Sequence, residues 1–193
     1  MPRRLFLARH GETDWNAIGR LQGTTDIPLN DRGREHGRAI AANLARHGIA
    51  EVITSDLARA RETGEIVARE LELPAPRIVP GIRERAFGVF EGLSRDECMA
   101  RYPEAWQRWH EQTGVPEGAE ALAAATERMH AALLELADAA GGPAIVISHG
   151  GVMRLWLVDI SDRHQRPFAP LANGVTYVCE RIAERWSANR LEG

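Results

Sequence analysis

Residues 5–10 read Leu-Phe-Leu-Ala-Arg-His, and residues 144–149 read Ala-Ile-Val-Ile-Ser-His. Each is a short apolar run that ends in a polar residue followed by a histidine. A continuous apolar run of this length is typical of a strand that is buried on both faces of a parallel sheet. In open α/β sheets the residues that follow the strands line the ligand crevice. We therefore expect His10 and His149 to converge at one edge of a sheet.

The rest of the chain alternates between strand and helix patterns. Strands are predicted at residues 4–8, 51–54, 144–148 and 175–179, with a short one near 78–79 and a partner for the last at 182–187. Helices are predicted at about 31–46, 57–71, 119–139 and 152–159. Asn30 is a candidate N-cap for the first helix and Ser55 or Asp56 for the second, whereas residues 14–30 are expected to form a loop. This alternation predicts a layered α/β domain.

Length and composition limit the functional classes. A chain of 193 residues fits one domain. All 24 basic residues are arginine, and with 27 acidic residues the net charge is −3, which argues against a basic nucleic-acid-binding surface. Cys98 and Cys179 lie far apart and are expected to be reduced thiols in a cytoplasmic protein. The apolar run at 5–8 is too short for a signal peptide or a membrane span.

Three predicted strands lead into polar motifs. Arg9-His10 follows the first, Ser55-Asp56 with Arg59 follows the second, and His149-Gly150-Gly151 follows the third. If these motifs meet at one sheet edge, they bring together two histidines and at least two arginines. That combination suits an anionic substrate and a histidine that acts as nucleophile or as acid and base.

In this order, the motifs resemble the signature of the histidine phosphatase superfamily, the phosphoglycerate mutase-like enzymes. The resemblance covers roughly residues 4–180 and rests on four segments: 7–16 with Arg9-His10-Gly11-Glu12-Thr13, 55–63 with Arg59, 83–92 with Arg83-Glu84 and Phe87-Gly88, and 148–151 with Ser148-His149-Gly150-Gly151. It implies a three-layer α/β/α sandwich with a mostly parallel central sheet, forming a single domain over residues 1–193.

The resemblance also implies the role of each catalytic residue. His10 would accept the phosphoryl group and form a phosphohistidine, for which its imidazole must be neutral. Arg9 and Arg59 would clamp the phosphoryl oxygens, and His149 would donate a hydrogen bond to the same group. Glu84 would give a proton to the leaving alkoxide and then activate water. The alternative for Glu84 is a surface salt bridge with a neighbouring arginine.

Four further residues are expected to bind substrate. The side chain of Asn16 and the side chain and backbone of Gln22-Gly23 are expected to contact the phosphate, as is Gly150 at a helix start. Gly11 is expected to leave room for the ligand. No metal and no cofactor are expected, because the histidines and arginines already supply a nucleophile and charge neutralisation.

Residues 85–118 have an irregular pattern and are predicted to form a lid-like insertion, which we call the lid segment. Phe87, Phe90, Trp106 and Trp109 are candidates for lining a partly apolar lid, with packing of the aromatic side chains onto the core as the alternative. Arg85, Arg95 and Arg108 are candidates for meeting a second acidic group of the substrate.

The lid segment also bears on the reaction. Dedicated mutases of this family carry a longer insertion with a paired-arginine segment, whereas this chain offers Gln107-Arg108-Trp109-His110. We therefore expect a phosphatase that acts on a small phosphorylated metabolite. The alternatives are a cofactor-dependent phosphoglycerate mutase, a phosphoprotein phosphatase and a non-catalytic binder of a phosphorylated ligand. The sequence leaves the particular substrate and the oligomeric state open.

Overall fold

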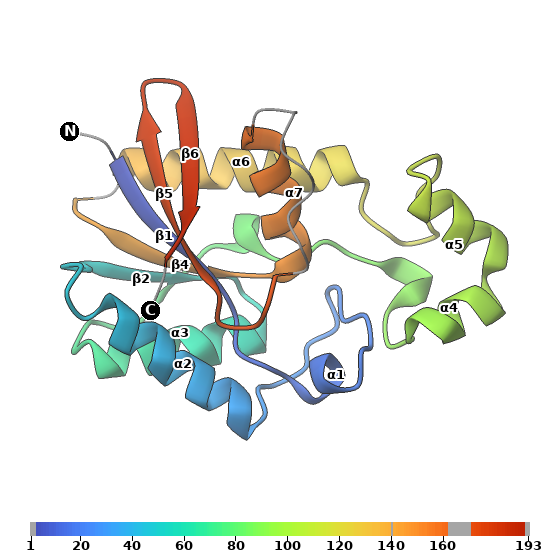
Figure 1. Cartoon of the computed structure of the whole chain (residues 1–193), viewed down its shortest axis with the longest axis horizontal. Helices are drawn as coiled ribbons and strands as arrows, with labels where there is room; N and C mark the ends of the chain where they lie inside the picture. The colour runs from blue at the N-terminus through green and yellow to red at the C-terminus, as the bar shows by residue number, and fades with distance from the viewer. Residues whose placement is uncertain (1–2, 140, 162–170, 192–193) are drawn as a thin grey trace.

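The computed structural model describes residues 3–139, 141–161 and 171–191. Its centre is a sheet with the strand order β3-β2-β4-β1-β5-β6 (Figure 1). The strands are β1 (Arg3–Arg9), β2 (Glu51–Thr54), β3 (Arg77–Ile78), β4 (Ala144–Ser148), β5 (Thr176–Ile182) and β6 (Arg185–Arg190). The four strands β3, β2, β4 and β1 run parallel, and β5 and β6 add an antiparallel hairpin beside β1.

Helices cover both faces of this sheet. The α-helices of the described residues are α1 (Asp14–Ala17), α2 (Asp31–Leu44), α3 (Ala58–Glu70), α4 (Arg95–Arg101), α5 (Pro103–His110), α6 (Leu122–Ala139) and α7 (Gly150–Ile160). Short 3-10 turns occur at Pro80–Ile82 and Gly88–Phe90. Helices α2 and α3 pack on one face, and α6 and α7 on the other. The expected three-layer α/β/α arrangement is thus confirmed.

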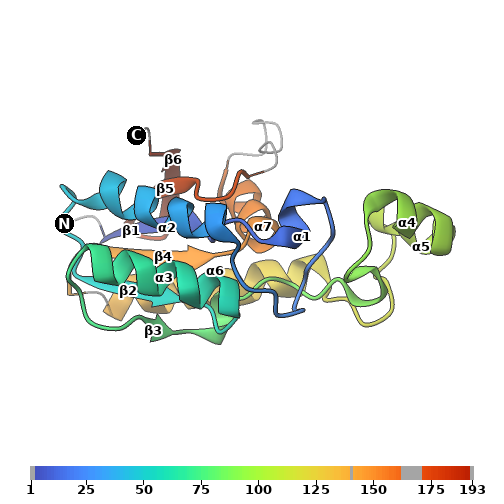
Figure 2. The same ribbon diagram turned by 90° about the horizontal axis from the view of Figure 1, so that it is seen from below.

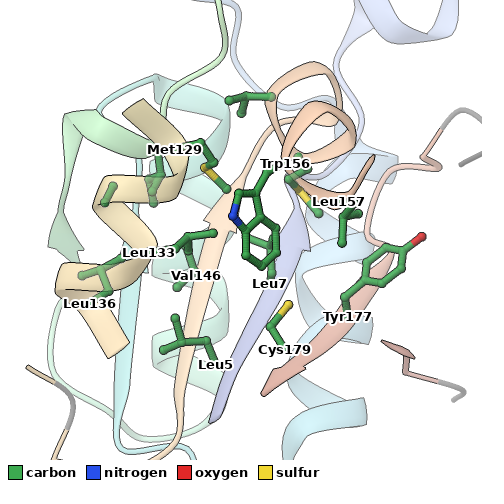
Figure 3. Close-up of a cluster of buried hydrophobic side chains, with 14 of the residues drawn as sticks. Leu5, Leu7, Met129, Leu133, Leu136, Val146, Trp156, Leu157, Tyr177 and Cys179 are labelled. Carbon is green, nitrogen blue, oxygen red and sulfur yellow. The ribbon is translucent and has the colours of Figure 1, made fainter. Parts of the chain in front are cut away.

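Strand β1 shows why the sheet has two buried faces. Leu5 and Leu7 point to the core under α6 and α7, while Phe6 and Ala8 point to the core under α2 and α3. All four side chains are fully buried, as the period of two along a strand requires when helices cover both sides. In the first of these cores, Trp156 lies over Leu7 and is surrounded by residues of α6, β4 and β5 (Figure 3).

Most predicted elements are confirmed to within a few residues, including the cap of α2. The Asn30 side chain accepts a hydrogen bond from the Gly33 backbone N–H at 2.8 Å. Two predictions were wrong in detail. The hairpin pairs β5 with β6 at 185–190 rather than 182–187, because the turn falls at Ala183, which has a φ of 54°. Ser55 and Asp56 do not cap α3, whose N-cap is Leu57 without a side-chain bond.

The segment 14–30, expected as a loop, contains the short helix α1. Its N-cap, Thr13, accepts a hydrogen bond from the Asn16 backbone N–H at 3.1 Å, and the Asn16 side chain accepts one from the Thr13 backbone N–H at 3.2 Å. This reciprocal capping box stabilises a single turn that the sequence pattern is too short to reveal.

The lid segment has an apolar cluster of its own. Phe90, Leu93, Cys98 and Trp106 are buried together with Phe87, separately from the two cores of the sheet. Both views show α4 and α5 at one end of the molecule, away from the sheet (Figure 1, Figure 2). The aromatic side chains therefore pack mainly against each other, and not onto the sheet core.

No helix within the described ranges is long and apolar enough to cross a membrane. Cys98 and Cys179 are both buried and carry free thiols.

Candidate active site

The carboxyl ends of three neighbouring parallel strands bring the predicted motifs together. In the register of the sheet, Arg9 of β1 lies beside Ser148 of β4, and Thr54 of β2 lies beside Ile147. The residues that follow these strands therefore leave the sheet at the same edge. The main chain links them, since the His10 N–H donates to the Ser148 carbonyl oxygen at 3.0 Å.

His10 is held in one orientation at the floor of a cavity. Its Nδ1 lies 2.6 Å from the Gly11 carbonyl oxygen, which can only accept, so Nδ1 carries the proton and Nε2 keeps its lone pair. Burial lowers the pKa of His10 well below its ordinary value, and the charges of Arg9 and Arg59 lower it further. The neutral imidazole with a free Nε2 is the form that can act as a nucleophile.

His149 lies behind His10, with 5.1 Å between the ring centroids. Its Nε2 is 2.6 Å from the Ser55 hydroxyl oxygen, which also accepts the Leu57 N–H at 3.3 Å. The Ser55 hydroxyl can donate to Nε2, which would place the His149 proton on Nδ1, a buried atom without a hydrogen-bond partner among the residues that the structure describes. Burial, followed by the charge of Arg59, lowers the pKa of His149 well below its ordinary value.

Arg59, the second residue of α3, is 1% exposed and lines the cavity. Its Nη1 and Nη2 donate to the carbonyl oxygens of Thr25 and Gly23 at 2.9 and 2.7 Å, whereas its buried Nε has no partner among the described residues. Burial lowers the pKa of Arg59 to about 10, so the group stays charged at neutral pH. Arg61 is exposed, as expected.

Arg9 also lines the cavity. Its Nη1 donates to the Leu171 carbonyl oxygen, and its buried Nε has no partner within the part of the chain that the structure describes. Burial lowers the pKa of Arg9, while the charges of Glu84 and Glu12 oppose that shift. Arg9 and Arg59 thus bring two guanidinium groups to one cavity, which suits an oxyanion.

Glu84 is 7% exposed and lies at the N-terminus of α7. Its carboxyl oxygens accept backbone N–H bonds from Gly151 at 2.8 Å, Val152 at 2.9 Å and Arg85 at 3.0 Å. The alternative, a surface salt bridge with Arg83 or Arg85, is not found among the described residues, because Glu84 is buried and Arg83 pairs with Asp56. Three fixed donors hold this carboxyl group at the cavity wall, where a proton can pass to or from a bound molecule.

The cavity has a volume of about 240 Å³. Eight of the nine predicted catalytic and binding residues line it, and only the fully buried His149 does not: they are Arg9, His10, Asn16, Gln22, Gly23, Arg59, Glu84 and Gly150. Gly23 has a φ of 54°, and a Cβ there would lie 2.1 Å from the Glu91 carboxyl group. Only glycine fits that position.

The predicted role of Gly11 was wrong. A Cβ on Gly11 would lie 2.2 Å from the Gly33 carbonyl oxygen, so this glycine permits the close approach of α2 and does not make room for a ligand.

Several residues around the cavity were not in the predicted site: Arg20, Leu21, Phe87, Gly151, Arg154 and Leu171 line it. Arg154 follows Gly150 by four positions on a helix, so helical spacing was a usable signal. Asn173 had no such signal. It lies far from the motifs in sequence, yet its amide donates to the carbonyl oxygens of His10 and Gly11 and to the Asn16 side chain, each at 3.1 Å.

The charges of the cavity favour an anion. Among the described residues, four arginines line it, namely Arg9, Arg20, Arg59 and Arg154, together with one carboxylate, that of Glu84. Arg20 is paired with Glu97 at 2.6 Å. Within the residues that the structure describes, no group of three or more His, Cys, Asp or Glu side chains is arranged to hold a metal ion.

Comparisons with known proteins agree with this geometry. The family model of the histidine phosphatase superfamily (branch 1) matches residues 5–192. A metal-independent phosphoserine phosphatase of Arabidopsis thaliana is 36% identical over 155 residues, and phosphoglycerate mutase-like protein 4 of the same plant is 37% identical over 158. These matches cover 78% of this chain and 65% and 67% of the two relatives, so the chain spans about two thirds of their length.

Solved structures match over nearly the whole chain. A mycobacterial glucosyl-3-phosphoglycerate phosphatase in complex with VO3 has a TM-score of 0.85 at 26% identity, with 97% of this chain and 98% of that chain covered. A putative alpha-ribazole-5'-P phosphatase from Escherichia coli has a TM-score of 0.85 at 25% identity, with 100% and 97% covered. The fold, the order of the motifs and the family match agree, and the chain belongs to the histidine phosphatase superfamily.

Proposed function

We propose that this protein is a phosphomonoester hydrolase that works through a phosphohistidine on His10 and acts on a small phosphorylated metabolite. The observation that carries the proposal is the state of His10. Its Nδ1 faces the Gly11 carbonyl oxygen, its ring lines a cavity together with the guanidinium groups of Arg9 and Arg59, and burial with these two charges lowers its pKa, which favours the neutral ring.

In the first step, Nε2 of His10 attacks phosphorus and the bond between phosphorus and the ester oxygen breaks. Glu84, in its protonated form, gives its proton to the departing alkoxide. Arg9 and Arg59 neutralise the charge on the transferring phosphoryl oxygens, and Nδ1 of His149 donates to one of them. Two observations support that role of His149: its Nδ1 has no hydrogen-bond partner among the described residues, and its ring centroid lies 5.1 Å from that of His10.

In the second step, the Glu84 carboxylate takes a proton from a water molecule that attacks the phosphohistidine. The bond between nitrogen and phosphorus breaks, inorganic phosphate leaves, and His10 and Glu84 return to their starting states. The histidine and arginine side chains supply nucleophile and charge, so the proposed cycle uses no metal and no cofactor.

We further propose a domain organisation, a substrate size and a cellular location for this activity. The chain acts as a single histidine phosphatase domain whose lid segment covers part of the cavity, to which Phe87 and its aromatic cluster contribute. The cavity of about 240 Å³ suits a small ester. Free, buried Cys98 and Cys179 support a cytoplasmic location, and the net charge of −3 supports a partner other than nucleic acid.

The test is a panel of phosphomonoesters assayed for release of inorganic phosphate in the presence of a chelator. We expect turnover of at least one small ester and an acid-labile phosphoenzyme that is absent in His10→Ala. Isomerisation of a phosphoglycerate without release of phosphate would assign the alternative mutase activity. Labelling of His149 in place of His10 would reverse the two histidine roles.

A further inference from the structure

The side chain of Asn173 binds three acceptors around the nucleophile with a single amide group. Its Nδ2 lies 3.1 Å from the carbonyl oxygens of His10 and Gly11 and 3.1 Å from Oδ1 of Asn16. Carbonyl oxygens can only accept hydrogen bonds, so the atom that faces them must be the amide nitrogen and not the amide oxygen. The partners of Asn173 therefore fix the orientation of its side chain.

The backbone on each side of Asn173 is fixed independently, through contacts with Arg9. The Gly174 N–H donates to the Arg9 carbonyl oxygen at 3.1 Å, and the Arg9 N–H donates to the Val175 carbonyl oxygen at 3.0 Å. The Leu171 carbonyl oxygen accepts a hydrogen bond from the Arg9 guanidinium. The segment that carries Asn173 is thus anchored on the end of β1, and its amide group has a defined position.

The backbone of the nucleophile is bound on its donor side by other elements. The His10 N–H donates to the Ser148 carbonyl oxygen, and the Gly11 N–H donates to the Thr63 hydroxyl oxygen, each at 3.0 Å. The carbonyl oxygens of the same two residues accept from Asn173. Strand β4 and helix α3 therefore hold the donors of this turn, and Asn173 holds its acceptors.

The Gly11 carbonyl oxygen is the group that selects the tautomer of His10. Nδ1 of His10 lies 2.6 Å from it, and a hydrogen bond there needs a proton on Nδ1, which leaves the lone pair of Nε2 for phosphorus. The carbonyl oxygen keeps this position only while its planar peptide group does not rotate. The bond from Asn173 opposes that rotation.

The third bond from Asn173 orients the amide group of Asn16, which lines the cavity. Oδ1 of Asn16 accepts from the Thr13 N–H at 3.2 Å and from Asn173 at 3.1 Å. Because the oxygen is bound to two protein donors, the amide nitrogen is the part of Asn16 that is left for a ligand. An N–H group attracts an anionic oxygen, whereas an amide oxygen would repel it.

We propose that Asn173 is a positioning residue that sets two groups of the active site at once. It keeps Nε2 of His10 unprotonated through the Gly11 carbonyl oxygen, and it directs the amide nitrogen of Asn16 to the phosphoryl group. The inference rests on the proposed phosphatase function. Asn173 is not among the described residues that line the cavity, so its effect passes through His10 and Asn16.

Two substitutions keep the branched shape of the Asn173 side chain but remove its N–H donors. Asn173→Leu is uncharged, and Asn173→Asp turns a carboxylate toward three oxygen acceptors. We expect both to slow phosphoenzyme formation about 10–100-fold in rapid-quench experiments, because a misplacement of about 1 Å costs roughly 100-fold in a positioned reaction. Asn189→Ala, at an exposed asparagine of β6, is the control and should keep the wild-type rate. A wild-type rate in either Asn173 variant would overturn the inference.

Binding of inorganic phosphate tests the route through Asn16. We expect Asn16→Ala and Asn173→Leu each to raise the Kd for phosphate about tenfold or more in calorimetric titrations. The double variant should bind about as weakly as Asn16→Ala alone, because the two changes remove the same interaction. Losses that multiply in the double variant would overturn this route.

Nitrogen-15 NMR of histidine-labelled protein reports the tautomer of His10 without turnover. The resonances of His10 are those that disappear in His10→Ala. We expect the wild-type ring to carry its proton on Nδ1 alone and Asn173→Leu to show a mixture of both tautomers below its Tm, whereas a loss of stability alone would leave the tautomer unchanged. The same tautomer in both proteins, or a proton on Nε2 in the wild type, would overturn the inference.

Failure of the inference and failure of the proposed function give different results. Wild-type protein that releases phosphate, with Asn173 variants that match it in rate and tautomer, would contradict only the role of Asn173. Wild-type protein that releases no phosphate from any ester, with a tautomer that still depends on Asn173, would contradict only the proposed function.

Discussion

Gly151→Ala should displace the Glu84 carboxyl group without unfolding the protein. A Cβ at position 151 would lie 2.6 Å from Oε1 and 2.9 Å from both Cδ and Oε2. Ordinary contacts begin near 3.4 Å, so the carboxyl group must move by about 0.8 Å. The N–H groups of Arg85 and Val152 also hold this carboxyl group, and the movement strains those bonds.

A misplacement of about 1 Å costs roughly 100-fold in a positioned reaction, so we expect a loss of about 10–100-fold in the step that needs the proton. Replacing glycine by alanine in the first turn of α7 favours the helix by about 0.5–1 kcal/mol, which offsets part of the steric cost to stability. The Tm should therefore change little while activity falls.

The assay is rapid-quench measurement of phosphoenzyme formation with two esters. An alkyl phosphate needs a proton on its leaving oxygen, whereas 4-nitrophenyl phosphate hardly does. Gly151→Ala should slow the alkyl ester far more than the nitrophenyl ester, and Glu84→Gln should show the same selectivity in stronger form. Glu84→Gln should also prolong the life of the phosphohistidine, because the same carboxylate activates water.

Gly141→Ala is the control, because a Cβ there would meet nothing within 4 Å. It should leave both rates unchanged. An equal loss for both esters in Gly151→Ala, or no loss for either, would refute the assignment of Glu84 as the proton donor.

Arg59→Ala should lose about 2–4 kcal/mol of transition-state stabilisation in kcat/KM, and a larger loss in exposed Arg61→Ala would contradict the assignment of the clamp. Thermal stability should fall as the pH drops below 6.5, because burial and the nearby arginines keep His10 and His149 neutral in the folded state while the unfolded chain binds protons there. The His149→Gln variant should show a shallower decrease in Tm over that range, and an unchanged slope would contradict the cause. Glu91→Gln should lower kcat/KM about tenfold and destabilise the fold by about 1–3 kcal/mol, because Glu91 binds the Thr24 and Thr25 backbone N–H groups of the loop that holds Arg59. Unchanged activity with a lowered Tm would make Glu91 a purely structural residue.

Local patterns in the sequence were enough to predict much of the fold. The apolar runs at 5–8 and 144–148 predicted strands buried on both faces, because a strand with helices on both sides has no solvent-facing position. Asn30 predicted the start of α2, because an N-cap needs only its own side chain and the N–H of Gly33. The motifs showed that His10 and Arg59 follow predicted strands. Parallel pairing of those strands brings the residues that follow them to the same edge of the sheet.

Tertiary structure decided what depends on residues that are distant in sequence. Ser55 carries the local signal of a helix cap, yet the pairing of β2 with β4 places its hydroxyl against His149. Asn173 reaches the His10 carbonyl oxygen only because the chain after α7 returns beside β1.

Arg85 shows most clearly the difference between what the sequence predicts and what the tertiary structure decides. In the sequence it is one of 24 arginines and one of three candidates for meeting a second acidic group of the substrate, but the sequence does not predict how deeply it is buried. In the folded chain, Phe87 and Trp109 enclose it, and Glu84 and Glu120 are committed to other donors. The sequence determines which side chains a protein has. Whether a charged side chain is buried depends on which elements pack around it, and only the complete tertiary structure decides that.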